Sequence, residues 1–315
     1  MIIGHEAQLG QLRQAGKSNQ LANSYLFSGP DGIGKKLVAI EFIKGLFCTA
    51  PSPAPCGTCI PCLKIEHNTH PDVIMVSVEE DKKDISIEQM RKVQSSIQMH
   101  PLEGRYKIVI IDNAEKMNAS AANSMLKALE EPPAVTHFFL VTSRPHMLLP
   151  TILSRCHKIS FSPPQAMSIV PYIQKTAGID EKMAELLANV SGGSIGLALS
   201  LSTDLLNEAL EAVQKIWNRT GPSELIAIAE RWGKSDVDHG TILAFLISIY
   251  RDIALYQAVK KPPVFKMIAE KIAAMAETTP PRTTEKKLAS FFSAQRDLET
   301  TYNKQLLFEQ LLFML

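Results

Sequence analysis

The sequence lacks an excess of charge of either sign. Its 315 residues include 33 lysines and arginines against 32 aspartates and glutamates, so the formal net charge is +1. A stand-alone nucleic-acid binder usually carries a broad positive field, and this chain has none overall. Any contact with nucleic acid would have to use a local basic patch.

The sequence also lacks segments that would direct it to a membrane. No stretch approaches the ~18 uninterrupted apolar residues that a membrane-spanning helix needs. The first residues, from Met1 to Glu6, contain no charged stretch followed by an apolar run and a small-residue cleavage site. We therefore predict no signal peptide, no membrane partner and a cytoplasmic location.

Cysteines are few, and their spacing is uneven. Four of the five lie between Cys48 and Cys62, and Cys156 stands alone. In an intracellular chain such clustering favours metal binding over disulfides. The other bulk properties are ordinary, with 45% hydrophobic and 21% charged residues, so we expect folded domains.

The first half of the chain alternates between strand-like and helix-like patterns. Apolar runs that favour buried strands lie at 24–28, 72–76, 108–111, 137–141 and 159–161. Apolar residues at helical spacing predict helices at 36–47, 87–99 (with Ser86 as its N-cap) and 118–131. Buried strands separated by helices are typical of an α/β fold with a parallel sheet covered on both faces.

Beyond Pro164 the strand patterns end. Residues 165–200 resemble a small helical unit with a turn at 191–193, and residues 204–315 have helical patterns throughout. Pro262-Pro263 and the segment 278–281 predict loops between these helices. We expect domains at 1–163, 164–203 and 204–315.

A glycine-rich segment follows the first predicted strand. The residues from Gly29 to Lys35, GPDGIGK, match G-x-x-x-x-G-K with Gly29, Gly32 and Gly34 as glycines, and a predicted helix follows. In that context the pattern predicts a phosphate-binding loop, because backbone N–H groups, the helix N-terminus and Lys35 all attract an anion. The alternative is an ordinary glycine-rich turn.

Lys36 and Asn113 are not the residues that a working ATPase site has at these two positions. The residue after the loop lysine should carry a hydroxyl that ligates Mg²⁺, and here it is Lys36. The strand 108–111 ends in Asp112, which resembles the aspartate that holds Mg²⁺, although a loop-capping aspartate would look the same. Asn113 follows, and Glu115 stands too far along to replace a water-activating glutamate. The sequence leaves ATP or ADP binding open and argues against hydrolysis.

The cysteine cluster has the spacing Cys48-x7-Cys56-x2-Cys59-x2-Cys62. Four thiolates fill all the positions of a tetrahedral Zn²⁺ site, which predicts structural zinc rather than a catalytic metal.

Three further expectations concern the residues around the cysteine cluster. The prolines and glycine of the segment predict an irregular loop rather than a helix: Pro51, Pro53, Pro55, Gly57 and Pro61. His67 and His70 could replace Cys48 but are expected to be solvated, and Cys156 is expected in the core.

Arg155 follows a helix-like segment at 148–153. The simplest interpretation is a surface arginine beside a buried cysteine. In a chain with a nucleotide-binding fold, the alternative is an arginine finger, which enters the active site of a neighbouring subunit. In GTPases such an arginine raises the rate of hydrolysis by a factor of about 10³–10⁵.

These features, in this order, resemble the bacterial clamp-loader family of AAA+ proteins. The most specific segments are 126–133 (LKALEEPP), 138–142 (FFLVT) and 154–156 (SRC). The four-cysteine insertion after the phosphate loop also belongs to that family. The resemblance implies an AAA+ domain at 1–163 with a zinc module at 48–62, a three-helix lid at 164–203 and a helical collar for oligomerisation at 204–315.

Within that family the sequence resembles δ′-type subunits more than the motor subunits. Motor subunits carry a sensor arginine in a G-S-x-R-x-A-L pattern, and Gly196 stands at the position of this arginine. Lys36, Asn113 and Gly196 are thus all changed, whereas Arg155 is retained. The resemblance implies a non-hydrolysing stator that donates Arg155 to a neighbour, and an active γ/τ-like motor is the alternative.

The resemblance also implies partners. Motor (γ/τ) and δ subunits would join this chain in a heteropentamer, which would contact the sliding clamp and primer–template DNA. A third hypothesis is a zinc-dependent nucleic-acid binder unrelated to clamp loading, against which the near-neutral charge counts.

Overall fold

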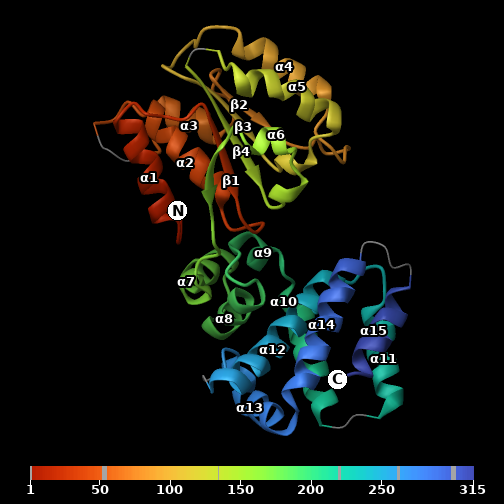
Figure 1. Cartoon of the computed structure of the whole chain (residues 1–315). Coiled ribbons are helices and arrows are strands. Elements are labelled where there is room, and N and C mark those ends of the chain that lie inside the picture. Colours follow the sequence, from red (N-terminus) through yellow and green to blue (C-terminus); the bar gives the residue numbers. More distant parts are fainter. Residues whose placement is uncertain (1, 52–54, 134, 219–220, 261–262, 299–302) are drawn as a thin grey trace. The chain divides into compact units, whose positions relative to one another are not determined.

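The computed structural model describes residues 2–51, 55–133, 135–218, 221–260, 263–298 and 303–315. The chain separates into two compact units, residues 1–164 and residues 165–315 (Figure 1). The further division of the second unit into lid and collar stays a prediction. Pro53 and Pro262, which entered the loop predictions, lie outside the described residues.

The first unit is built on one parallel sheet. Its strands are β1 (Ser24–Ser28), β2 (Val73–Val76), β3 (Lys107–Ile111), β4 (Thr136–Thr142) and β5 (His157–Ser160). Their spatial order is β2-β3-β4-β1-β5, and each neighbouring pair is parallel. The predicted α/β fold with a parallel sheet is therefore confirmed.

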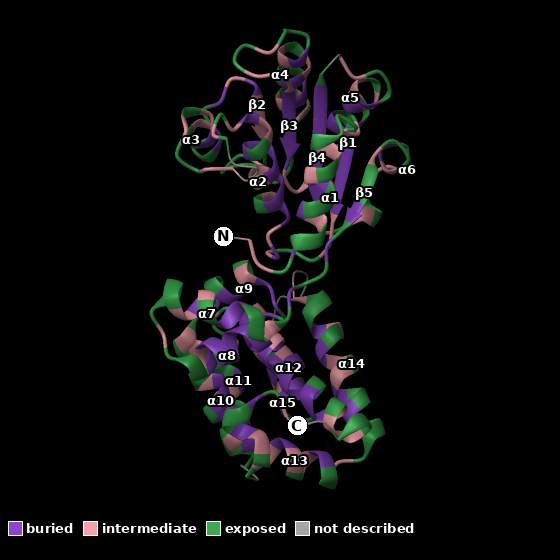
Figure 2. Ribbon diagram, turned by 90° about the vertical axis from the view of Figure 1, so that its left-hand side faces the viewer, coloured by how far each residue is buried: buried purple, intermediate pink, exposed green. Residues whose placement is uncertain are grey.

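Helices cover both faces of this sheet. They are α1 (Glu6–Lys17), α2 (Lys35–Phe47), α3 (Ile60–Glu66), α4 (Ile87–Ile97), α5 (Ala119–Glu130) and α6 (Pro150–Leu153). Side chains of β3 alternate between two buried clusters, with Ile108 and Ile110 packed beside α1 and α2, and Val109 and Ile111 packed beside α4 and α5. Figure 2 shows the central strands as the buried layer. This two-sided burial explains why the strands are continuous apolar runs.

Local capping sets where several helices begin. Ser86 caps α4 in a full capping box, in which its side chain accepts from the Gln89 N–H and the Gln89 side chain accepts from the Ser86 N–H. Asn118 caps α5 by accepting from Ala121. The Ser86 cap is as predicted, and α5 begins one residue later than expected because Asn118 is its cap.

The prediction of an irregular loop throughout the cysteine segment is wrong for its second half. Helix α3 begins directly after Cys59, and Pro61 lies in its first turn. Proline is tolerated there because the first helical N–H groups need no partner within the helix. Cys62 is therefore a helical residue.

The second unit is helical throughout its described residues. Its helices are α7 (Ala166–Ala177), α8 (Glu181–Val190), α9 (Ile195–Ser200), α10 (Thr203–Trp217), α11 (Pro222–Trp232), α12 (His239–Val259), α13 (Ala269–Thr278), α14 (Pro281–Asp297) and α15 (Lys304–Leu312). The turn predicted at 191–193 lies between α8 and α9. The loop predicted at 278–281 is shorter than expected, since only residues 279 and 280 lie between α13 and α14. By length and composition alone α12 could cross a membrane, but half of its most apolar window is buried, as in the core helix of a folded domain.

A buried carboxylate holds the segment before β3 in place. Asp72 is fully buried, and its oxygens accept hydrogen bonds from the backbone N–H groups of Leu102 (2.7 Å), Glu103 (2.7 Å) and Gly104 (2.9 Å). Lys107 Nζ lies 3.4 Å from the same carboxylate. Burial acts to raise the pKa of Asp72, but these bonds outweigh it and the pKa lies below its ordinary value.

We expect Asp72→Asn to lower the free energy of unfolding by about 3–5 kcal/mol, because it removes one partner of a buried ion pair. Since the folded-state pKa of Asp72 is depressed, its stabilisation is present at neutral pH and is lost as the pH falls through that pKa. Urea unfolding at neutral and acidic pH should therefore show the variant's deficit shrinking in acid. Asp81→Asn, at an exposed position, is the control. Equal losses at both positions would contradict the role of Asp72.

Candidate functional site

The phosphate loop joins β1 to α2 at the carboxyl edge of the sheet. Gly29, Gly32 and Gly34 have φ angles of 156°, 70° and 97°, which residues with side chains rarely adopt. A Cβ atom on Gly29 would lie 2.3 Å from the carbonyl oxygen of Phe161, so a side chain is also excluded by space. The three glycines are therefore required by the loop's conformation.

Lys35 is turned into its own loop. Its side chain is buried, and Nζ donates hydrogen bonds to the carbonyl oxygens of Gly29 (2.8 Å) and Pro30 (2.6 Å). Burial lowers the pKa of Lys35, while Asp31 and the other nearby carboxylates act to raise it. The ammonium group thus neutralises the loop's carbonyl dipoles, and a phosphate would have to draw it away from them.

Lys36 forms an ion pair with the predicted metal-holding aspartate. Lys36, in the first turn of α2, places Nζ 3.0 Å from Oδ2 of Asp112, which follows β3. The predicted site residues on these two elements are therefore brought together. The resident ammonium occupies a carboxylate oxygen that Mg²⁺ would need as a ligand.

Glu115 is held by the end of β4. Its Oε1 accepts hydrogen bonds from the backbone N–H (3.2 Å) and hydroxyl (2.7 Å) of Ser143. Burial acts to raise the pKa of Glu115, but the bonds from Ser143 and Thr142 outweigh it and lower the pKa overall. Sequence reasoning missed Ser143, although a polar residue directly after a strand at this edge was the available signal.

His5 is a second residue that sequence reasoning missed. Its buried ring places Nε2 2.6 Å from the carbonyl oxygen of Ile33 and packs edge-on against Phe161 at 5.1 Å. Because a carbonyl can only accept, Nε2 carries the proton. The N-terminal segment is thereby fastened to the phosphate loop, and a lone histidine in the sequence carries no signal for this contact.

The four clustered cysteines converge in space. Their sulfur atoms all lie within 4.8 Å of one another: Cys48, Cys56, Cys59 and Cys62. Tetrahedral Zn²⁺ with Zn–S bonds of ~2.3 Å separates its sulfurs by roughly 3.8 Å, so the set fits a metal ion after a small contraction. The sulfur of Cys48 accepts a hydrogen bond from the backbone N–H of Cys56 (3.4 Å), and the sulfur of Cys56 accepts one from the backbone N–H of Cys59 (3.2 Å). The cluster could therefore hold a metal ion.

The cysteine pKa values differ with their surroundings. Hydrogen bonds from Thr58, with a contribution from Cys59, lower the pKa of Cys56 to about 5, so its thiolate forms readily. Burial raises the pKa of Cys62 to about 12. Cys62 would give up its proton only to a cation bound beside it.

The histidines near the cluster separate into two kinds. His67 is exposed, as expected, but the prediction that His70 is solvated is wrong. His70 is buried, packs edge-on against Phe47 at 4.7 Å and accepts the Asp72 N–H through Nδ1 (3.1 Å). Its burial lowers its pKa. Cys156 lies outside the cluster and is partly buried against the core, where burial raises its pKa to about 11.

Arg155 lies on the surface, between α6 and β5. Its Nη2 pairs with Oε1 of Glu130 at 2.5 Å, and Nη1 donates to the Thr151 carbonyl oxygen (3.0 Å) and to the Ser154 hydroxyl (3.2 Å). The side chain is 33% exposed. The guanidinium group is therefore not enclosed by its own fold.

The second unit contains Gly196 and a separate cavity. Gly196 is an exposed residue of α9.

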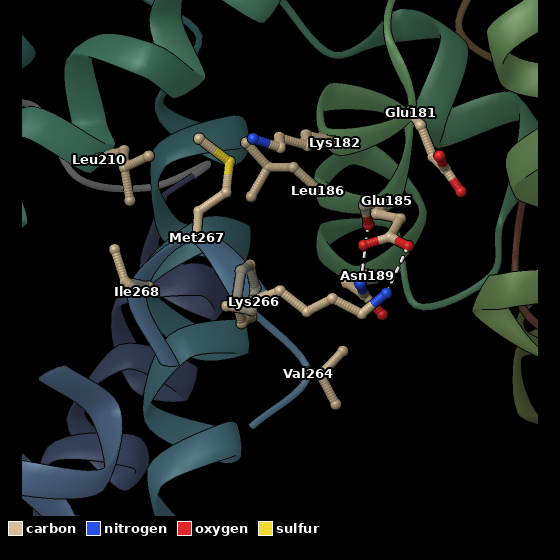
Figure 3. Close-up of a pocket in the computed structure, with 11 residues that line it drawn as sticks. Glu181, Lys182, Glu185, Leu186, Asn189, Leu210, Val264, Lys266, Met267 and Ile268 are labelled. Atoms are coloured by element: carbon tan, nitrogen blue, oxygen red, sulfur yellow. Dashed lines mark hydrogen bonds and ion pairs between the residues drawn. The ribbon is translucent and has the colours of Figure 1, made fainter. Parts of the chain in front are cut away.

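The cavity of the second unit has a volume of about 510 Å³ and lies between α8 and the segment 264–268. Lys266 Nζ pairs there with Glu185 at 2.7 Å (Figure 3). None of the predicted site residues lines this cavity.

The five-stranded parallel sheet, the phosphate loop at its carboxyl edge and the helical second unit define an AAA+-type P-loop protein. The model of the family described as "DNA polymerase III, delta subunit" matches residues 4–165, and that of "DNA polymerase III, delta subunit, C terminal" matches residues 203–315. DNA polymerase III subunit delta′ of Bacillus subtilis (strain 168) is 31% identical over 308 residues, which cover 95% of this chain and 92% of the relative. The chain belongs to the DNA polymerase III delta′ subunit family.

Two further similarities extend to other subunits. DNA polymerase III subunit tau of Bacillus subtilis (strain 168) is 28% identical over 311 residues, covering 87% of this chain and 55% of the relative. The crystal structure of a DNA polymerase III gamma subunit-related protein from Thermotoga maritima aligns over 98% of both chains, with 20% identity and a TM-score of 0.48.

We expect the purified chain to bind one equivalent of Co²⁺ with the absorption of sulfur-to-cobalt charge transfer, because four thiolates converge on one point. Replacement of Cys59 by serine should weaken binding by at least about tenfold, since one of the four metal–sulfur bonds is lost. Cys156→Ser, outside the cluster, is the matched control. Unchanged Co²⁺ binding in Cys59→Ser would contradict the assignment.

Proposed function

We propose that this chain is a non-hydrolysing delta′-type stator of a bacterial clamp loader. In this role it donates Arg155 to the ATP site of an adjacent motor subunit while its own phosphate loop stays inactive. The complex loads a sliding clamp onto primed DNA in the cytoplasm. Membership in the delta′ family supports the general role.

One observation carries the arginine-finger proposal, namely the edge of the sheet at which Arg155 lies. Strand β5 runs parallel to β1, in register from Tyr25↔His157 to Ser28↔Ser160. The phosphate loop follows β1, whereas Arg155 precedes β5, so the two lie at opposite ends of these strands. Four strand residues span about 13 Å. The position of Arg155 therefore favours contact with a nucleotide bound to another protein over contact with a nucleotide at its own phosphate loop.

The contacts of Arg155 suit this task. A guanidinium group has five N–H donors, and here three hydrogen bonds hold it. Two donors remain for phosphate oxygens of a neighbour. Glu130, at the end of α5, orients the group without burying it. An arginine fixed in this way can stabilise charge on a transferring phosphoryl group at little entropic cost.

The chain's own nucleotide site supports the absence of hydrolysis. Lys36 holds Asp112, and Glu115 is bound to Ser143. Asn113 has no carboxylate at the position of the water-activating glutamate, and Gly196 has no guanidinium group at the position of the sensor arginine. ATP or ADP could bind only by displacing Lys35 from the loop carbonyls.

Structural Zn²⁺ is the metal that we assign to the cysteine cluster. Cys48, Cys56, Cys59 and Cys62 would hold it, and it would cross-link the end of α2 to α3. Two ion pairs, Lys44 with Glu66 and Lys64 with Glu103, already tie α3 to its surroundings. Bonds from Zn²⁺ to the four sulfur atoms would fix the conformation of this proline-rich segment.

The proposed assembly is a heteropentamer with γ/τ motor and δ subunits. Residues 204–315 are the proposed collar through which the subunits join. The alternative is an active motor, which similarity to tau and the complete G-x-x-x-x-G-K loop favour. ATP hydrolysis by the isolated chain, lost in Lys35→Ala, would support that alternative.

We expect Arg155→Ala to abolish turnover at the adjacent motor site in the reconstituted complex, because an arginine finger is worth about 10³–10⁵ in rate in GTPases. The measurement uses a complex in which only that motor subunit can hydrolyse ATP, and gel filtration checks assembly. Arg144→Ala, an exposed arginine at the opposite edge of the sheet, is the matched control. Normal turnover in an intact Arg155→Ala complex would refute the proposal.

We expect Lys36→Thr to create Mg²⁺-dependent nucleotide binding, because it frees Asp112 and supplies a hydroxyl ligand. Titration with a fluorescent ADP analogue should show an affinity gain of about tenfold on addition of Mg²⁺. Lys36→Met removes the charge without supplying a ligand and should show a smaller gain. Identical Mg²⁺ responses in both variants would contradict the role of residue 36.

A further inference from the structure

A basic pocket lies between α1, α2 and the residues that precede β3. Its volume is about 210 Å³. Arg13 and Lys17 of α1 and Arg105 supply its positive charges, and Phe42, Leu46 and Tyr106 supply its apolar lining. None of these residues belongs to the phosphate loop, the cysteine cluster or the surroundings of Arg155.

The three cations of the basic pocket form no ion pair with any residue that the structure describes. Arg13 and Lys17 are four residues apart, which places both on one face of α1. Lys17 and Arg105 are exposed, and Arg13 is half-buried. Within the described residues, no ion pair involves any of the three or Glu41, the acidic residue of the lining. The pocket therefore carries an excess of positive charge that a ligand can neutralise.

Contacts within the fold hold the apolar lining in place. A Cβ atom on Gly16 would lie 3.2 Å from Leu46, so the glycine lets α1 approach α2 closely. Phe42 is a buried core residue. Tyr106 donates its hydroxyl to Asn19 Oδ1 (3.2 Å) and packs edge-on against His137 at 5.2 Å. A ligand would bind without paying the entropic cost of ordering these groups.

We propose that the basic pocket binds an acidic peptide segment of a partner protein. One bulky apolar side chain of the peptide occupies the lining of Phe42, Leu46 and Tyr106. Flanking carboxylates pair with Arg13, Lys17 and Arg105. Arginine is well suited to this pairing because its fork of donors matches a carboxylate.

The shape of the pocket favours a peptide over nucleic acid. The three cations surround one hollow with room for a single side chain, whereas a nucleic-acid backbone needs cations spaced along a track. The apolar lining also offers few hydrogen-bonding groups to the polar edges of a base. The proposal is independent of the arginine-finger role, since it uses a different surface.

The test measures fluorescence anisotropy of a fluorescein-labelled peptide in which one leucine stands between two pairs of aspartates. Arg13→Glu and Arg105→Glu should each weaken binding by at least about tenfold, because each turns an attraction into a repulsion. Arg91→Glu, at an exposed position of α4 on the other face of the sheet, changes the net charge equally and should leave binding unchanged. Leu46→Ser should also weaken binding, as should serine in place of the peptide's leucine.

Three results would overturn the proposal. The first is the absence of peptide binding by the unmodified chain at low ionic strength. The second is an equal loss in Arg91→Glu and Arg105→Glu, which would indicate non-specific attraction. The third is tighter binding of a single-stranded thymidine oligonucleotide that depends on Arg13 and Arg105, which would make the pocket a nucleic-acid site. Circular dichroism establishes that each variant is folded.

Discussion

All strands of the sheet run in the same direction, and this constraint organises the chemistry of the first unit. The carboxyl ends of β1, β3 and β4 meet at one edge, where they bring together the phosphate loop, Asp112 and Ser143. The amino ends lie at the other edge, beside Arg155 and Glu130. A single parallel sheet thus places the phosphate loop and Arg155 at opposite edges. The proposed division of labour between this chain and a neighbour depends on that separation.

At the carboxyl edge, two successive lysines of the first unit make their contacts within the protein. Lys35 donates to the carbonyl oxygens of Gly29 and Pro30, and Lys36 pairs with Asp112. These contacts satisfy polar groups of the loop and of Asp112 within the protein itself. The shape of a nucleotide-binding fold is retained because the sheet and its two cores require it, whether or not nucleotide binds.

Two other parts of the first unit gather polar or metal-ligating groups. Asp72 binds three successive backbone N–H groups, and the four cysteines that could hold a metal ion converge in a segment rich in proline. Lys64 and Glu103 connect these two parts. The basic pocket lies beside them, where Arg105 and Tyr106 leave the anchored segment. Its geometry therefore depends on the same buried carboxylate.

Local patterns in the sequence were sufficient for the strands, the Ser86 cap, the glycine-rich loop between β1 and α2 and the convergence of the four cysteines, because each depends on residues close together in the chain. They failed for the helical position of Cys62, since a proline in a first helical turn resembles a proline in a loop, and for the burial of His70. The contacts of Lys36 with Asp112, Glu115 with Ser143 and Arg155 with Glu130 join residues that are 76, 28 and 25 positions apart. Only the pairing of distant strands decides such contacts, because it is tertiary packing that brings the ends of separate elements to one edge.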